Sequence, residues 1–282
     1  MKFQRKTLVE NLTFGECPRW HDGSLWFSDM HAHCVMVARL DGTCKKVVDV
    51  PGRPSGLGWL PDGRLLIVSM VDRLLLRLEG DELVEHADLN DIATWHCNDM
   101  VVDGRGNAYV GNFGFDLEVE EPEPAEATMA LVTMDRTVKP AADGLLFPNG
   151  TVITPDRQTL IVAETYGARL TAFDIRPDGS LTNRRLFADL SPNTPDGICL
   201  DEEGAIWVAD PVNGECFRVL EGGNVTHRIF TGRGCFACML GGPDRKILFL
   251  MTADDFLPEK VRQARNGKIE IVEVEVPGAG LP

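Results

Sequence analysis

Short hydrophobic triplets recur along the chain, each following a turn rich in Asp and Gly. Their central residues are 41 to 52 positions apart: Trp26, Ile67, Tyr109, Ile161, Trp207 and Phe249. Short apolar runs between turn residues indicate β-strands rather than helices, whose apolar positions recur about every 3.6 residues. Repeats of about 40 to 50 residues with several strands each are typical of β-propellers. The pattern therefore predicts an all-β protein, a six-bladed β-propeller.

The fourth repeat shows the expected blade most clearly. Its strands are predicted at 151–154, 159–163, 169–175 and 181–187, with turn-forming Pro, Asp and Gly residues between them. The last repeat has strands near 246–252 and 268–276 but lacks a fourth. We expect the unpaired segment 7–13 to complete that last blade, which removes an exposed sheet edge. Residues 1–282 are then expected to form one propeller domain.

Composition limits the classes of partner. The 282 residues include 28 Lys and Arg against 43 Asp and Glu, a formal charge of −15. Such a surface repels phosphate backbones and anionic lipids, so we expect neither a nucleic-acid partner nor a membrane partner. No apolar run has the length of a signal peptide or a membrane span, which predicts a cytoplasmic protein. We expect a monomer or a weak homodimer.

Eight cysteines are spread through the chain, and without a secretion signal they are expected to be reduced. Cys235 and Cys238 have the C-x-x-C spacing found in redox and zinc sites. Because there is no second pair and no His nearby, we interpret them as small buried hydrophobic side chains.

Polar residues occupy two equivalent positions in most repeats. The first position lies ten to twelve residues before each triplet centre and holds Glu16, Ser55, Asn98, Asn149, Asp196 and Ala237. The second lies three residues after each centre and holds Asp29, Met70, Asn112, Glu164, Asp210 and Thr252. In a propeller each position forms a ring at the same mouth, where carboxylates repel unless a cation or a hydrogen-bond network compensates. We favour a divalent cation held by hard oxygen donors.

Several segments together resemble one known family, the SMP-30/gluconolactonase/regucalcin-like lactonases, which are six-bladed propellers. These segments are GECPRW at 15–20, HCNDMVVDGRGNAYVGNF at 96–113, FPNG at 147–150, AETYGARL at 163–170 and PDGICLDEEGAIWVAD at 195–210. The resemblance covers nearly the whole chain. It implies that Glu16, Asn149 and Asp196 are metal ligands and that Asn98 binds substrate.

Two positions bear on specificity. Family members that act on sugar lactones often have an Arg where this chain has His96, and a neutral imidazole binds hydroxyls differently from a charged guanidinium. The acidic lid contact of the family aligns with Asp116. We expect Asn98, His96 and Asp116 to orient the substrate, with Tyr166 as a wall of the site.

The predicted function is hydrolysis of a sugar-acid lactone or a related small lactone by a water molecule that one divalent ion activates. Ca²⁺ is the expected ion, with Mn²⁺, Mg²⁺, Zn²⁺ and Fe²⁺ as alternatives. Asp196 is the candidate general base, and Asn98 is the second catalytic candidate. No G-x-S-x-G motif supports a serine nucleophile.

Three alternatives stay open from the sequence. A metal ion at the same position would also promote hydrolysis of a phosphotriester. A propeller can also serve as a binding module without catalysis. The acidic, Pro-containing insertion at 117–128 is interpreted either as a solvated loop or as a lid over the mouth.

Overall fold

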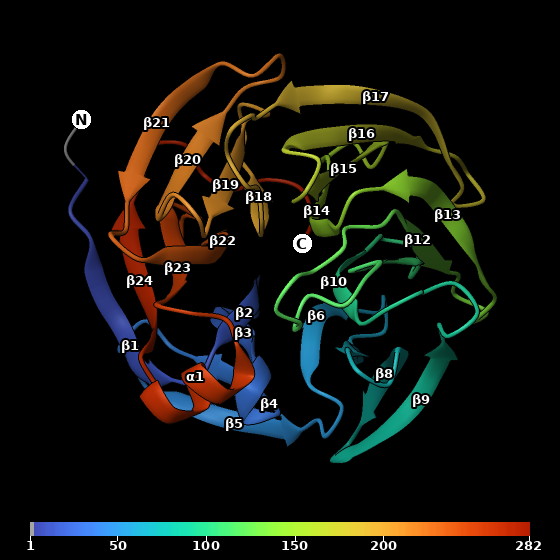
Figure 1. The fold of residues 1–282 in the computed structure, drawn as a ribbon, viewed down its shortest axis with the longest axis horizontal. Coiled ribbons are helices and arrows are strands. Elements are labelled where there is room, and N and C mark those ends of the chain that lie inside the picture. The colour runs from blue at the N-terminus through green and yellow to red at the C-terminus, as the bar shows by residue number, and fades with distance from the viewer. Residues whose placement is uncertain (1–2) are drawn as a thin grey trace.

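Six four-stranded antiparallel sheets surround a central axis, so the protein is a six-bladed β-propeller (Figure 1). The computed structural model describes residues 3–282. The predicted fold class is therefore confirmed.

Each of the first five blades consists of four consecutive strands, with the first strand nearest the axis. Blade one contains β2 (Gly15–His21), β3 (Ser24–Asp29), β4 (Cys34–Ala38) and β5 (Cys44–Asp49). Blade two contains β6 (Pro54–Trp59), β7 (Leu65–Ser69), β8 (Leu74–Glu79) and β9 (Glu82–Asp88). Blade three contains β10 (Cys97–Val102), β11 (Ala108–Asn112), β12 (Ala127–Val132) and β13 (Val138–Leu145).

Blades four and five continue this order. Blade four contains β14 (Pro148–Ile153), β15 (Thr159–Glu164), β16 (Arg169–Ile175) and β17 (Leu181–Asp189). Blade five contains β18 (Ile198–Leu200), β19 (Ile206–Asp210), β20 (Glu215–Val219) and β21 (Val225–Phe230). Three of the strands predicted for the fourth repeat lie within the observed ones, whereas the first, predicted at 151–154, begins at Pro148 and ends at Ile153.

The sixth blade joins the two ends of the chain. It contains β22 (Gly234–Gly241), β23 (Ile247–Ala253), β24 (Gly267–Glu273) and, as its outermost strand, β1 (Lys6–Leu12). Strand β1 pairs antiparallel with β24, from Lys6 opposite Ile271 to Leu12 opposite Gly267 (Figure 1). The prediction that an N-terminal strand completes the last blade is confirmed, and this pairing covers the β24 edge.

The segment after β24 departs from the prediction. The strand expected to reach residue 276 ends at Glu273, and the chain then crosses the face of the ring where the inner strands end. There the Leu281 backbone exchanges two hydrogen bonds with Ile153, at 2.8 and 2.9 Å, and the Ala279 nitrogen donates to the Leu200 carbonyl at 2.9 Å. The C-terminal segment therefore links blades four and five at that face.

Two short helices lie at the opposite face, and the sequence analysis did not foresee them. They are the 3₁₀ helix η1 (Met30–Ala32) and the α-helix α1 (Pro258–Ala264). Proline at the first position of α1 suits a helix start, because its fixed φ is already helical. The Arg262 Nε of α1 donates to the His31 carbonyl of η1 at 3.3 Å. Within residues 3–282, no helix has the length and apolar character to cross a bilayer.

The hydrophobic triplets form the core between the blades. Five of the six triplet centres are buried, namely Ile67, Tyr109, Ile161, Trp207 and Phe249. The sixth, Trp26, is half-buried and meets Trp59 of blade two edge to face, with ring centroids 5.6 Å apart. Burying these side chains provides the main driving force that fixes the blades around the axis.

The cysteines are free thiols, and seven of the eight are buried. The Cys238 Sγ donates toward the carbonyl oxygens of Trp207, at 3.4 Å, and Gly197, at 3.5 Å. These contacts agree with the interpretation of the C-x-x-C pair as buried core residues.

Candidate active site

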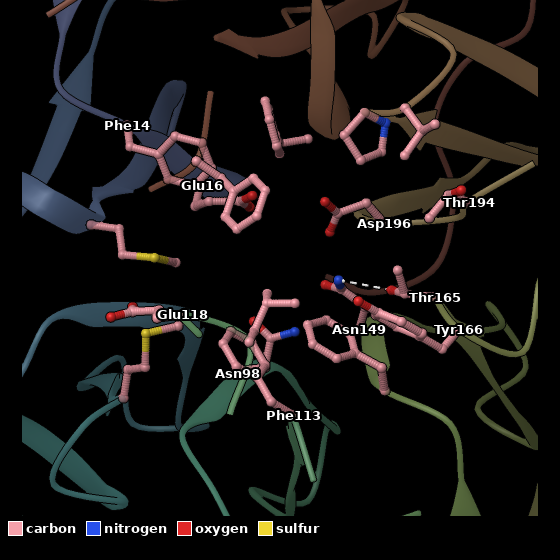
Figure 2. A pocket seen from close by; sticks show the side chains of 18 of the residues that line it. Phe14, Glu16, Asn98, Phe113, Glu118, Asn149, Thr165, Tyr166, Thr194 and Asp196 are labelled. Atoms are coloured by element: carbon pink, nitrogen blue, oxygen red, sulfur yellow. Dashed lines mark hydrogen bonds between the residues drawn. The ribbon is translucent and has the colours of Figure 1, made fainter. Parts of the chain in front are cut away.

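A cavity of about 490 Å³ opens at the mouth of the ring where the inner strands begin (Figure 2). Glu16, Asn98 and Asn149 are each the second residue of an inner strand, and Asp196 lies two residues before β18. All four side chains line this cavity, and Figure 2 shows the polar ends of Glu16, Asp196 and Asn149 directed into one space. The structure therefore brings together the four polar residues of the first predicted ring.

The other two positions of that ring hold no ligand group on the cavity lining. Ser55 is buried, and its hydroxyl donates to the Asn98 Oδ1 at 3.4 Å. Ala237 is also buried. The polar side of the site is therefore formed by blades one, three, four and five.

Irregular strand pairing turns the ring residues toward the axis. The pairing of the first two strands shifts register between Glu16 and Arg19 in blade one, and blades two, three, four and six shift at the equivalent position. Such bulges free a residue from the ladder and redirect its side chain. Gly150, beside Asn149, permits a further close approach, because a Cβ there would lie 2.4 Å from the Ile198 nitrogen.

Burial of two carboxylates dominates the electrostatics of the site. Glu16 and Asp196 are each only 8% exposed. Burial raises the pKa of Glu16 to about 8, despite a hydrogen bond from the Cys17 nitrogen at 2.9 Å. Burial, and then the charges of Glu16 and Asp99, raise the pKa of Asp196 well above its ordinary value. A cation between these two carboxylates would favour their charged forms and remove the repulsion.

The donor atoms fit a hard divalent cation. The Asn149 Nδ2 donates to the Thr165 Oγ1 at 3.1 Å, which leaves the Asn149 Oδ1 as the free end of the amide (Figure 2). Together with Glu16 and Asp196, this oxygen completes a set of oxygen donors of the kind that Ca²⁺ and Mg²⁺ prefer. Among residues 3–282, no three His, Cys, Asp or Glu side chains are grouped so that they could hold a metal ion.

Asn98 has a different bonding state. Its Oδ1 accepts the hydrogen bond from Ser55, while its buried Nδ2 has no partner among the residues that the structure describes. The free group of Asn98 is therefore a donor. A donor suits an oxygen of a substrate rather than a cation.

The second predicted ring does not line the cavity with carboxylates. In blade one, the Asp29 carboxylate accepts hydrogen bonds from the Thr13 nitrogen, at 3.2 Å, and the Phe14 nitrogen, at 2.8 Å. In blade four, Glu164 accepts from the Leu146 nitrogen at 2.9 Å. In this second ring, hydrogen bonds from the backbone stabilise the carboxylates, so the expectation that a metal ion does so is replaced by the alternative of a hydrogen-bond network.

These carboxylates act as clamps on the loops that enter the inner strands. Asp210 of blade five accepts from the Thr194 nitrogen at 3.2 Å, in the same manner as the carboxylates of blades one and four. Each clamped loop carries a cavity residue, namely Phe14, Phe147 or Thr194. Every one of these three residues lies two positions before a residue of the first ring. That repeated spacing is the sequence signal that would have located them.

The upper walls of the cavity are largely aromatic. On one side, the rings of Phe14 and Phe236 meet edge to face, with centroids 4.8 Å apart. On another side, Phe113 and Phe147 are stacked at 4.5 Å, and Tyr166 packs against Phe147 at 5.7 Å. Tyr166, a predicted wall residue, therefore lines this cavity. The other four aromatic residues were not foreseen.

A family model described as the SMP-30/gluconolactonase/LRE-like region matches residues 14–254. The chain belongs to this family. The matched range contains Glu16, Asn98, Asn149 and Asp196, and it leaves out the closing strand β1 and the C-terminal segment.

Relatives and solved structures of this family agree with the fold. A regucalcin from Xenopus laevis is 27% identical over 272 residues, covering 92% of this chain and 90% of that protein. The structure of a gluconolactonase from Xanthomonas campestris has a TM-score of 0.78 at 24% identity, covering 98% of this chain and 90% of the other. A calcium-binding regucalcin from Agrobacterium tumefaciens has a TM-score of 0.83 at 23% identity, with 99% and 97% covered.

Two residues expected to contact substrate lie outside the cavity lining. The His96 ring stacks on Trp95, with centroids 5.1 Å apart, and burial lowers its pKa. Asp116 accepts a hydrogen bond from the Glu118 nitrogen at 2.9 Å within its own loop. Among the described residues, Phe113 and Glu118 line this part of the cavity in place of His96 and Asp116.

The insertion between β11 and β12 reaches the mouth at its first residues only. Leu117 and Glu118 line the cavity, and Glu118 pairs with Arg53 of blade two, with Arg53 Nη2 and Glu118 Oε2 3.3 Å apart. At its other end, Ala127 already belongs to β12, so the predicted insertion ends too late by two residues. The Arg53 to Glu118 pair holds the start of this loop over the cavity.

Proposed function

We propose that the protein is a metal-dependent hydrolase that opens a lactone ring. One observation carries the proposal: two buried carboxylates, Glu16 and Asp196, face the same cavity as the free amide oxygen of Asn149. Two carboxylates in one buried space are costly unless a cation accompanies them. Membership of a family that includes gluconolactonases supports lactone chemistry.

Glu16, Asn149 and Asp196 are the residues that would hold the ion. Ca²⁺ suits their hard oxygen atoms best, and Mg²⁺, Mn²⁺, Zn²⁺ and Fe²⁺ are the alternatives. A divalent ion bound there supplies positive charge that polarises the carbonyl and makes a nearby water more acidic.

The residues of the chain then have distinct tasks. The attacking water adds its oxygen to the lactone carbonyl carbon, and Asp196 accepts the proton that this water loses. The Asn98 Nδ2 donates a hydrogen bond to a lactone oxygen and fixes the ring in position. The ring bond between carbonyl carbon and oxygen breaks, and the proton passes to the leaving oxygen, which gives a hydroxy acid. The aromatic walls keep other water away.

The deciding experiment combines chelation with one substitution. Purified protein is treated with chelator, each metal is restored in turn, and hydrolysis is followed with a panel of lactones and one neutral phosphotriester. Asp196→Asn should lower Ca²⁺ affinity, measured by calorimetry, at least tenfold, and lower kcat by about a hundredfold or more. If the protein turns over the phosphotriester and none of the lactones, lactone hydrolysis is refuted and phosphotriester hydrolysis is the function.

Asp29→Asn is the matched control. Asp29 is also a buried carboxylate at this mouth, but it clamps a loop and does not line the cavity. The Asp29→Asn variant should be less stable than the wild type, but its folded form should bind the metal with unchanged affinity. Full activity after chelation, or an Asp196→Asn variant with unchanged metal affinity and kcat, would refute the proposal.

A further inference from the structure

The cavity is lined by more apolar surface than the proposed reaction beside Glu16 and Asp196 requires. Phe14, Phe113, Phe147 and Phe236 are all buried side chains, and they line the same cavity as the carboxylates of Glu16 and Asp196. Figure 2 shows Phe14 and Phe113 on opposite sides of the space into which Asp196 points. Cavities of about 490 Å³ lie within the range that accommodates drug-sized ligands. A ligand that fills this space contacts aromatic carbon on more than one side.

Several polar groups on the lining are already engaged within the protein. The Asn193 Nδ2 donates to Asp210 at 2.7 Å and to Glu215 at 3.1 Å. The His31 Nε2 lies 3.0 Å from the Phe256 carbonyl, and Glu118 is paired with Arg53. These three groups are therefore not free to bind the hydroxyl groups of a sugar.

Two buried nitrogen atoms near the carboxylates match the two oxygen atoms of one ester function. Asn98 and His31 line the cavity, and their buried Nδ2 and Nδ1 atoms have no hydrogen-bond partner among residues 3–282. A lactone group brings two oxygen atoms, whereas a sugar lactone adds a hydroxyl on most of its ring carbons. Each buried hydroxyl left without a partner reduces affinity several-fold or more.

We propose that the substrate of this site is an apolar lactone, one that carries an alkyl chain or a fused aromatic ring, rather than a polyhydroxylated sugar lactone. The inference rests on the proposed function, because it names the substrate class of the same site. In this arrangement the lactone group lies beside Asp196, and the apolar substituent lies between the aromatic side chains of the cavity wall.

A series of δ-lactones with unsubstituted, butyl, hexyl and octyl side chains tests the substituent directly. With the metal-loaded protein, kcat/KM should rise about fourfold for each added methylene until the cavity is filled. Glucono-δ-lactone should be hydrolysed at least a hundredfold less efficiently than the hexyl compound. Equal or higher efficiency with glucono-δ-lactone would overturn the inference.

Two exposed phenylalanines provide a variant and a matched control. Phe256 lines the cavity rim and is 39% exposed, whereas Phe230 is 69% exposed on β21, away from the cavity. Phe256→Ser should lower kcat/KM for the octyl lactone about tenfold and change the unsubstituted lactone by less than about twofold. Phe230→Ser should alter neither value. Equal losses with both substrates would contradict contact between Phe256 and the chain.

Binding separates this inference from the proposed function. The matching lactams are not hydrolysed, so calorimetry with the hexyl lactam and with gluconolactam measures recognition alone. If no lactone is turned over but the hexyl lactam binds at least tenfold more tightly, lactone hydrolysis is refuted and the apolar specificity stands. If lactones are turned over but gluconolactam binds as tightly as the hexyl lactam, the proposed function stands and the inference fails.

Discussion

Glu164 of blade four provides a test of how the carboxylates of the second ring hold the loops that carry cavity residues. Glu164 is fully buried and accepts hydrogen bonds from the Leu146 nitrogen, at 2.9 Å, and from the Nε and Nη2 of Arg169, both at 2.8 Å. Leu146 directly precedes Phe147 of the cavity wall, and Asn149 follows two residues later. Replacing Glu164 by Gln therefore perturbs the loop that presents both residues.

The magnitude follows from the bonds that the substitution breaks. A Gln side chain has one acceptor oxygen, so it cannot accept from the Leu146 nitrogen and from both nitrogens of Arg169. A hydrogen bond to a charged group contributes about 1.5 to 3 kcal/mol. The Arg169 side chain is 34% exposed, so water replaces part of what it loses. We expect the free energy of unfolding to fall by about 2 to 4 kcal/mol.

Chemical denaturation measures this loss, and its pH dependence tests its cause. Burial raises the pKa of Glu164, but the hydrogen bonds from Arg169 and Thr171 outweigh burial and hold it below the ordinary value of 4.5. A carboxylate with a lowered pKa stabilises the fold above the unfolded pKa, and this contribution is lost as the pH falls through the folded value. The difference between wild type and Glu164→Gln should therefore be constant near pH 7 and shrink below about pH 4.5.

Glu203→Gln is the control for a Glu to Arg pair outside the site. Glu203 pairs with Arg218 at 2.8 Å, but its side chain is 62% exposed, so its loss should cost at most about 1 kcal/mol. If Glu164→Gln also costs less than about 1 kcal/mol, or if its effect does not depend on pH, the clamp does not stabilise the loop as argued.

Three further predictions concern other parts of the molecule. Glu118→Gln breaks the pair with Arg53 and should raise KM about three- to tenfold with little change in kcat, measured by steady-state kinetics, whereas Glu120→Gln, on the exposed part of the same loop, should change neither. Arg19→Met leaves the buried Asp99 without its ion-pair partner and should lower the free energy of unfolding by about 3 to 5 kcal/mol in urea; a loss below about 1 kcal/mol would refute this. Burial, and then the charge of Arg53, lower the pKa of His31 to about 4, so the unfolded chain binds a proton that the folded chain does not, and stability should fall as the pH drops from about 6.5 to 4. His31→Gln should flatten that slope, and an unchanged slope would contradict it.

The blade pattern could be predicted because its causes are local. Turn residues such as Pro177 and Asp178 and short apolar runs determine where each strand starts and ends, and the repeat spacing then counts the blades. The same register brings Glu16, Asn98, Asn149 and Asp196 to one mouth, because equivalent positions in a ring of repeats occupy equivalent places.

The second ring shows that the repeat position alone does not determine which side chains face the cavity. Asp29 and Glu164 occupy the predicted positions, yet they accept hydrogen bonds from the backbone of loops that enter the inner strands. Which polar side chain faces the cavity depends on bulges and on the loop that packs beside it. These are long-range contacts that a local pattern does not contain.

The grouping of Glu16, Asn98, Asn149 and Asp196 was thus predictable from the sequence, whereas the tertiary structure decided the walls of the cavity. His96 aligns with a specificity position, but its ring stacks on Trp95 and leaves the lining to Phe113. Phe236 of blade six meets Phe14, next to blade one, at the cavity wall because the ring closes through β1 and β24. Side-chain packing between distant segments sets the shape of a pocket, and that packing exists only in the folded chain.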